Sequence, residues 1–176
     1  MGNPSKLNKA DAKRLSDAQE AVSNARDAYV EARQEFESAC EKAIAGVDMP
    51  DSSSARRSAQ SIESSYTDLL RPKWDDLETA CSALRELCEE FFADLCAVWN
   101  ERSEKWQDSD AGSLASDWIS KFEEYEMPDE LPTVTVADLA QHAAEHGWSD
   151  ALTVFDHDYD SSCDAAEALV NNSKEL

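Results

Sequence analysis

Four aspartates and a glutamate near the C-terminal end are spaced like the ligands of a calcium-binding loop. In FDHDYDSSCDAAEAL, residues 155–169, acidic side chains occupy positions 1, 3, 5, 9 and 12 of the EF-hand pattern: Asp156, Asp158, Asp160, Asp164 and Glu167. Calcium prefers about six to eight hard oxygen ligands, so this spacing predicts a calcium site. Against it, Ser161 stands at position 6, where the sharp turn favours glycine, and no second loop is present to pair with it.

The same acidic residues also fit the start of a helix. Ser161 or Ser162 could cap a last helix running from about Ser162 to Val170, and carboxylates are stabilised near a helix N-terminus by its dipole. We favour this interpretation and keep the calcium-binding module as an alternative function.

The stretch HAAEH, residues 142–146, matches the HxxEH pattern of a zinc protease. Such a site needs a third ligand and a substrate cleft, and only 30 residues follow the motif. The four glycines are scattered, so they cannot form a phosphate-binding loop, and no serine stands in a nucleophile-elbow pattern. We therefore expect a protein that is not an enzyme and that needs no cofactor.

Charge is the most informative property of the chain. The formal net charge is -22, and residues 108–176 hold 17 acidic side chains but only two basic ones. Such a surface repels nucleic acids and anionic membranes and attracts basic surfaces over a Debye length of about 8 to 10 Å. The composition therefore predicts a basic protein partner, with no direct nucleic-acid binding and no membrane association.

Carboxylates three or four residues apart on a helix can imitate the spacing of successive phosphates, which lie about 6 to 7 Å apart along a strand. We therefore predict a nucleic-acid mimic that blocks the basic surface of a nucleic-acid-binding protein, by analogy of charge and size with phage-encoded inhibitors of restriction and CRISPR systems. The acidic residues that we expect to bind are Glu123, Glu124, Glu126, Asp129, Glu130, Asp156, Asp158, Asp160 and Asp164.

The elements that must carry these residues are long helices. From residue 15, large side chains recur every seven residues, with alanines three residues after each: Leu15, Val22, Tyr29, Phe36 and Ala43, then Ala18, Ala25, Ala32 and Ala39. This repeat predicts a helix of about 40 residues that ends before Gly46 and Pro50.

A complementary repeat follows in the second half: Leu70, Leu77, Leu84, Phe91 and Val98, then Trp74, Cys81, Cys88, Leu95 and Arg102. We expect an all-α fold in which a long antiparallel, coiled-coil-like hairpin, residues 1–107, carries a small acidic unit of short helices, residues 108–176. Pro72 predicts a kink or break near Arg71 and a separate short helix from Ala55 to Leu70. The alanine seam would serve a homodimer equally well.

A second aromatic stripe repeats at sevens beside this seam: Phe92, Trp99 and Trp106. We expect the C-terminal helices to cover it. If a partner covers it instead, Trp99 and Trp106 are the best candidates for the apolar anchors of the acidic interaction protein predicted above. A protein that binds through this stripe and not through its acidic residues would be a coiled-coil adaptor or an immunity-type binding protein. In the C-terminal unit, Leu114, Trp118, Phe122 and Tyr125 predict one face of an amphipathic helix after Gly112.

The five cysteines form neither CxxC pairs nor a ligand series, and we expect most of them to be small core residues. The N-terminal stretch has no apolar region of a signal peptide, and no segment approaches the roughly 18 apolar residues of a membrane span. We therefore expect a reduced, cytoplasmic protein.

Overall fold

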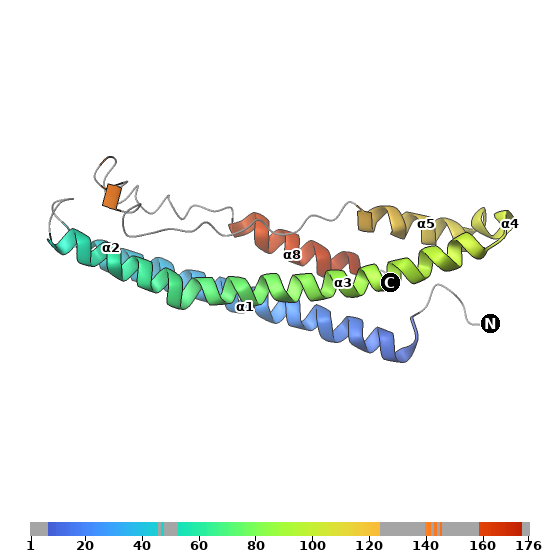
Figure 1. The fold of residues 1–176 in the computed structure, drawn as a ribbon, viewed down its shortest axis with the longest axis horizontal. Coiled ribbons are helices and arrows are strands. Elements are labelled where there is room, and N and C mark those ends of the chain that lie inside the picture. Colours follow the sequence, from blue (N-terminus) through green and yellow to red (C-terminus); the bar gives the residue numbers. More distant parts are fainter. Residues whose placement is uncertain are drawn as a thin grey trace. The chain divides into compact units, whose positions relative to one another are not determined.

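The computed structural model describes residues 7–45, 47, 53–123, 140, 141, 143, 145 and 159–173, with the backbone alone at 95, 98, 118–123, 159–162 and 172. All the elements in this part of the chain are helices (Figure 1): α1 (Lys9–Ile44), α2 (Ser53–Ser65), the π-helix η1 (Tyr66–Leu70), α3 (Arg71–Glu101), α4 (Glu104–Gln107), α5 (Asp110–Glu123) and α8 (Tyr159–Ser173). The all-α class predicted from the sequence is confirmed.

Helix α1 begins where its cap predicts. The side-chain Oδ1 of Asn8 accepts hydrogen bonds from the backbone N–H groups of Ala10 and Asp11 at 2.9 and 3.0 Å. These are two of the four N–H groups that a helix leaves without an internal partner, so Asn8 fixes the start of the helix. At 36 residues, α1 matches the long helix expected from the seven-residue repeat.

Helices α2, η1 and α3 follow one another without a non-helical residue between them. Pro72 would lose a hydrogen bond to the carbonyl of residue 68 and clash with it in a regular helix. The chain instead widens into one π turn, in which the backbone N–H of Arg71 donates to the carbonyl of Tyr66. The predicted kink or break therefore takes the form of a π turn directly before Arg71. The separate short helix predicted from Ala55 to Leu70 corresponds to α2 and η1, which pass into α3 without a non-helical residue.

The chain divides into two compact units. One combines residues 25–77 with 129–161, and its described core lies between the second half of α1 and the α2–η1–α3 segment. Tyr29 packs edge-to-face on Trp74 with ring centroids 5.5 Å apart, and Phe36 packs in the same way on Tyr66 at 5.8 Å. As α1 advances from one pair to the other, the partner runs backwards, so these segments are antiparallel.

The other unit combines residues 1–24, 78–128 and 162–176. Its described core holds Leu15, Val22, Leu84, Cys88 and Phe91 together with the inner face of α8, namely Ala166, Leu169, Val170 and Ser173. The amide of Gln19 donates to Ser173 Oγ at 2.9 Å, which ties α8 to α1.

The positions from Leu15 to Ala43 at intervals of seven, and both series of the second repeat, are buried wherever their side chains are described. The exceptions are Ala43 and Arg102 at the ends, which are half-buried. The alanines of the first repeat are mostly half-buried, and only Ala32 is in the core. A hairpin running through both units, the domain boundary at residue 107 and a homodimer stay predictions.

Two helices of the C-terminal part begin earlier than the sequence predicts. Helix α8 starts at Tyr159 rather than near Ser162, and α5 starts at Asp110 rather than after Gly112. An acidic residue lies in the first turn of α5, where the helix dipole favours it. None of the described helices is long and apolar enough to cross a membrane.

Candidate interaction surface

The predicted acidic binding residues fall largely outside the described part of the chain. Glu124, Glu126, Asp129, Glu130, Asp156 and Asp158 lie there entirely. Glu123 ends α5 and Asp160 lies in the first turn of α8, each described by its backbone alone, and Asp164 is exposed on α8. For this set the sequence prediction remains a prediction.

Three of the five predicted calcium ligands lie on one continuous helix. Asp160, Asp164 and Glu167 belong to α8, where seven residues correspond to a rise of about 10 Å. Calcium needs its oxygens to converge at about 2.3 to 2.6 Å from one point, which a regular helix does not provide. Among the described residues, no three His, Cys, Asp or Glu side chains are grouped to hold a metal. Calcium binding stays a prediction that would require this helix to open at its start.

The HxxEH stretch is described only in part. Glu145 is exposed. Both histidines of the motif, His142 and His146, lie outside the described residues.

The two tryptophans predicted as anchors lie at the end of α3 and in α4, and both are half-buried. The carbonyl of Trp99 accepts a hydrogen bond from the Gln107 side chain at 2.9 Å, which holds α4 back against the last turn of α3. The guanidinium carbon of Arg102 lies 5.5 Å from the centroid of the Trp106 ring. In this unit, the other helices therefore cover the stripe only partly.

Helix α5 starts in contact with α4 (Figure 1). Ser109 caps it: its hydroxyl accepts from the backbone N–H of Gly112 at 3.3 Å and donates to the carbonyl of Trp106. A Cβ added to Gly112 would lie 2.5 Å from the carbonyl oxygen of Trp106 and closer still to that of Gln107. Only glycine permits this approach of the two backbones, so Gly112 fixes how α5 leaves α4.

This close approach also sets the rotation of α5. Gly112 and Ala115 are buried, whereas Leu114 is 68% exposed. Leu114, predicted to lie on the apolar face of this helix, is instead open to solvent, because the backbone contact at Gly112 places Gly112 and Ala115 on the buried side.

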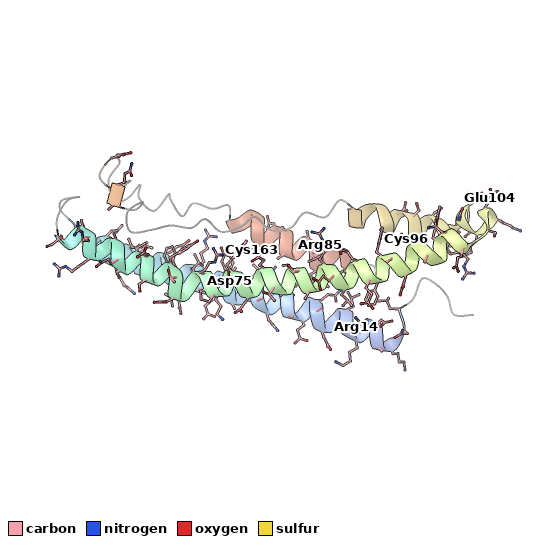
Figure 2. The ribbon with its side chains drawn as sticks, in the orientation of Figure 1. Arg14, Asp75, Arg85, Cys96, Glu104 and Cys163 are labelled. Atoms are coloured by element: carbon pink, nitrogen blue, oxygen red, sulfur yellow. The ribbon has the colours of Figure 1, made fainter. Side chains whose placement is uncertain are left out.

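Negative charge gathers around these tryptophans. We call residues 94–117, from the end of α3 through α4 to α5, the acidic corner. It carries six acidic side chains against two basic ones, Arg102 and Lys105. The six are all exposed: Asp94, Glu101, Glu104, Asp108, Asp110 and Asp117. None of them takes part in an ion pair with another described residue. Figure 2 shows Glu104 at this position.

The acidic row continues along α3. Glu86, Asp94 and Glu101 fall within a narrow arc of the helix, at rises of about 12 and 10 Å. Glu90 lies on the same arc, but Arg14 donates to both of its carboxylate oxygens at 3.1 and 2.8 Å. This hydrogen bonding holds the pKa of Glu90 below its ordinary value and raises that of Arg14.

The charge of residues 1–107 taken together does not reveal the acidic corner, because the basic residues of α1 offset the acidic ones of α3 over that range. A shorter window would have found it, because residues 78–117 hold ten acidic and three basic side chains.

Comparisons with models of protein families, with curated proteins and with solved structures find no match to this chain.

Proposed function

We propose that this chain is a non-enzymatic, acidic interaction protein that docks on the basic surface of a nucleic-acid-binding partner and blocks it. One observation carries the proposal: the acidic corner and the adjoining part of α3 present exposed carboxylates, most of them without an ion pair among the described residues, around two half-buried tryptophans. Interfaces commonly combine aromatic anchors with a charged, complementary surround.

The spacing of these carboxylates supports a nucleic-acid mimic in particular. The rises of about 10 to 12 Å along the row Glu86, Asp94 and Glu101 are close to twice the separation of successive phosphates, about 6 to 7 Å. A rigid helix holds these charges in place before binding, so less ordering entropy is lost on association. Phage-encoded inhibitors of restriction and CRISPR systems work on this principle, and we place the present chain in the same functional class.

The electrostatic part of the proposal makes association fast and sensitive to salt. Complementary charge raises the association rate and is screened over about 8 Å at physiological ionic strength. Raising salt should therefore weaken binding mainly by slowing association, with little change in the dissociation rate.

The test is a capture experiment followed by competition. The immobilised protein is exposed at low salt to a cell extract, bound proteins are eluted with salt and identified, and each is purified and loaded with a labelled DNA or RNA duplex. The proposal expects the chain to displace the duplex from a captured protein at near-stoichiometric concentration. It also expects a variant with Asp94, Glu101, Asp108 and Asp117 changed to lysine to fail.

Captured proteins that keep their nucleic acid in the presence of the chain would overturn the proposal. Binding that survives the four reversals and is lost in Trp99→Ala would instead support the adaptor alternative. A rise in the unfolding temperature with millimolar calcium, absent in Asp156→Ala and not reproduced by magnesium, would support the calcium alternative.

A further inference from the structure

The Trp106 ring already holds a cation. The Arg102 guanidinium lies over it at 5.5 Å, although four of the exposed carboxylates of the acidic corner lie within five residues of Trp106 along the chain: Glu101, Glu104, Asp108 and Asp110. Arg102 makes no ion pair with a described carboxylate. Among the described groups, Arg102 thus places its guanidinium over the ring face and makes no ion pair with these carboxylates.

A guanidinium over an exposed or half-buried ring is held weakly. Such contacts are attractive in water but become several times stronger once a partner excludes solvent from the ring. Arg102 lies between α3 and α4, where its backbone N–H donates to the carbonyl of Trp99 at 3.2 Å, so the connection between the two helices does not rest on the side-chain contact with the ring alone.

We propose that Trp106 is an arginine-stacking site and that its occupant in the complex is an arginine from a basic segment of the partner protein, which replaces Arg102. This inference rests on the proposed function and names the residue type that the acidic corner selects. Charge complementarity brings the basic segment to the corner, and the planar guanidinium stacks on the indole ring better than the ammonium of lysine does.

The experiment uses two labelled, unstructured peptides of equal length and charge. In one peptide every basic residue is arginine, and in the other every basic residue is lysine. Each is titrated at low salt into the full chain and into three variants: Arg102→Ala, Lys105→Ala and Trp106→Leu. The variants Arg102→Ala and Lys105→Ala remove the same charge from neighbouring positions, but only the first vacates the ring.

The inference expects the full chain to prefer the arginine peptide by roughly two- to five-fold. Arg102→Ala should tighten binding of that peptide about three-fold more than Lys105→Ala does. Trp106→Leu should abolish the preference while both peptides still bind in a salt-dependent way.

Equal, salt-dependent binding of the two peptides to all four proteins would overturn the inference and leave the proposed function standing. Absence of salt-dependent binding to either peptide would overturn both. The comparison of Arg102→Ala with Lys105→Ala keeps the ring in place, so it decides the question even if Trp106→Leu does not fold.

Discussion

Helix α1 and the acidic corner differ in how their charged side chains are balanced and paired. Over residues 9–44, α1 carries eight acidic and six basic side chains, and most of its basic residues are paired with a carboxylate, as Lys13 is with Asp17 and Arg33 with Glu37. Figure 2 shows Arg14 on this helix, and the Arg14 side chain pairs with Glu90 of α3. In the acidic corner, carboxylates outnumber bases three to one, and no ion pair involves them among the described residues.

The two regions differ in their apolar residues as well. The large residues of the seven-residue repeat in α1 are buried, and Tyr29 and Val22 are no more than 1% exposed, although Val30, outside the repeat, is 37% exposed. The tryptophans of the acidic corner are half-buried, and Leu114 is open to solvent. Paired charges over a buried seam fit a stabilising element, whereas unpaired charges around half-buried aromatic rings fit the binding surface that we propose.

The largest expected effect lies in the buried seam. Trp74 is 1% exposed and packs on Tyr29, so Trp74→Ala should leave a large cavity and lower the free energy of unfolding by about 3 to 5 kcal/mol. Chemical denaturation measures this change in the free energy of unfolding. Trp106→Ala should cost much less, because that ring is only half-buried. Similar losses of unfolding free energy in Trp74→Ala and Trp106→Ala would contradict the difference in burial between the two regions.

Gly112 tests whether the acidic corner is built as described. In Gly112→Ala, the added methyl group meets backbone carbonyls that cannot rotate away, so we expect a loss of about 1 to 3 kcal/mol despite the better helix propensity of alanine. Ser113→Ala, at the next and exposed position of α5, is the control and should be nearly neutral. A stabilised Gly112→Ala protein would show that α5 does not approach α4 this closely.

The reactivity of the cysteine thiols should distinguish buried positions from half-buried ones. Burial raises the pKa of Cys40 to about 12 and those of Cys81 and Cys88 to about 11, from an ordinary value of 9.0. These thiols therefore stay protonated and unreactive at pH 8. Cys96 and Cys163, both labelled in Figure 2, are half-buried. A maleimide reagent should label these two, and label the other three only after unfolding, as read by mass spectrometry. Rapid labelling of Cys81 in the native protein would contradict the described core.

The same pKa values predict how stability falls at high pH. A thiol that is protonated more strongly in the folded chain stabilises it fully below pH 9, and this contribution is lost as pH rises through 11 to 12. Denaturation curves at pH 7, 9 and 10.5 should show a constant stability up to about pH 9 and a decline above it.

The smallest effect should come from the exposed pair of Arg14 and Glu90. Because Arg14 lowers the pKa of Glu90, the pair contributes above pH 4.5 and is lost as pH falls through the folded value. Exposed pairs stabilise little, so Glu90→Gln should change the unfolding temperature only slightly at pH 7 and should reduce its fall between pH 5 and 3. A large loss at pH 7 would mean that this pair organises the unit.

How far the sequence predicts this fold depends on the kind of signal. The seven-residue repeats identify the buried positions from Leu15 to Phe36 and from Leu70 to Phe91, because burial on a helix follows its period. The continuous helix through Pro72 could not be predicted, since a π turn has no reliable sequence signature. The exposure of Leu114 depends on a backbone contact between α5 and α4 that helical periodicity does not encode.

The sequence predicts an acidic binding surface and names Trp99 and Trp106 as its anchors, and this site stays a prediction. What the structure adds is that both tryptophans are half-buried and that exposed carboxylates lie in the same helices. Which carboxylates are unpaired could not be predicted, because pairs such as Arg14 with Glu90 join residues 76 positions apart.

One measurement tests the central claim most directly: salt-dependent binding of an arginine-rich peptide to two charge-reversed variants. One changes Asp94, Glu101, Asp108 and Asp117 of the acidic corner to lysine, and the other changes four exposed residues of α1, Glu20, Glu31, Glu35 and Glu41. Both raise the net charge by the same amount. We predict that the first variant loses binding by roughly ten-fold or more and the second by roughly two-fold. Equal losses in the two variants would show that net charge alone attracts the peptide and would contradict a binding surface at the acidic corner.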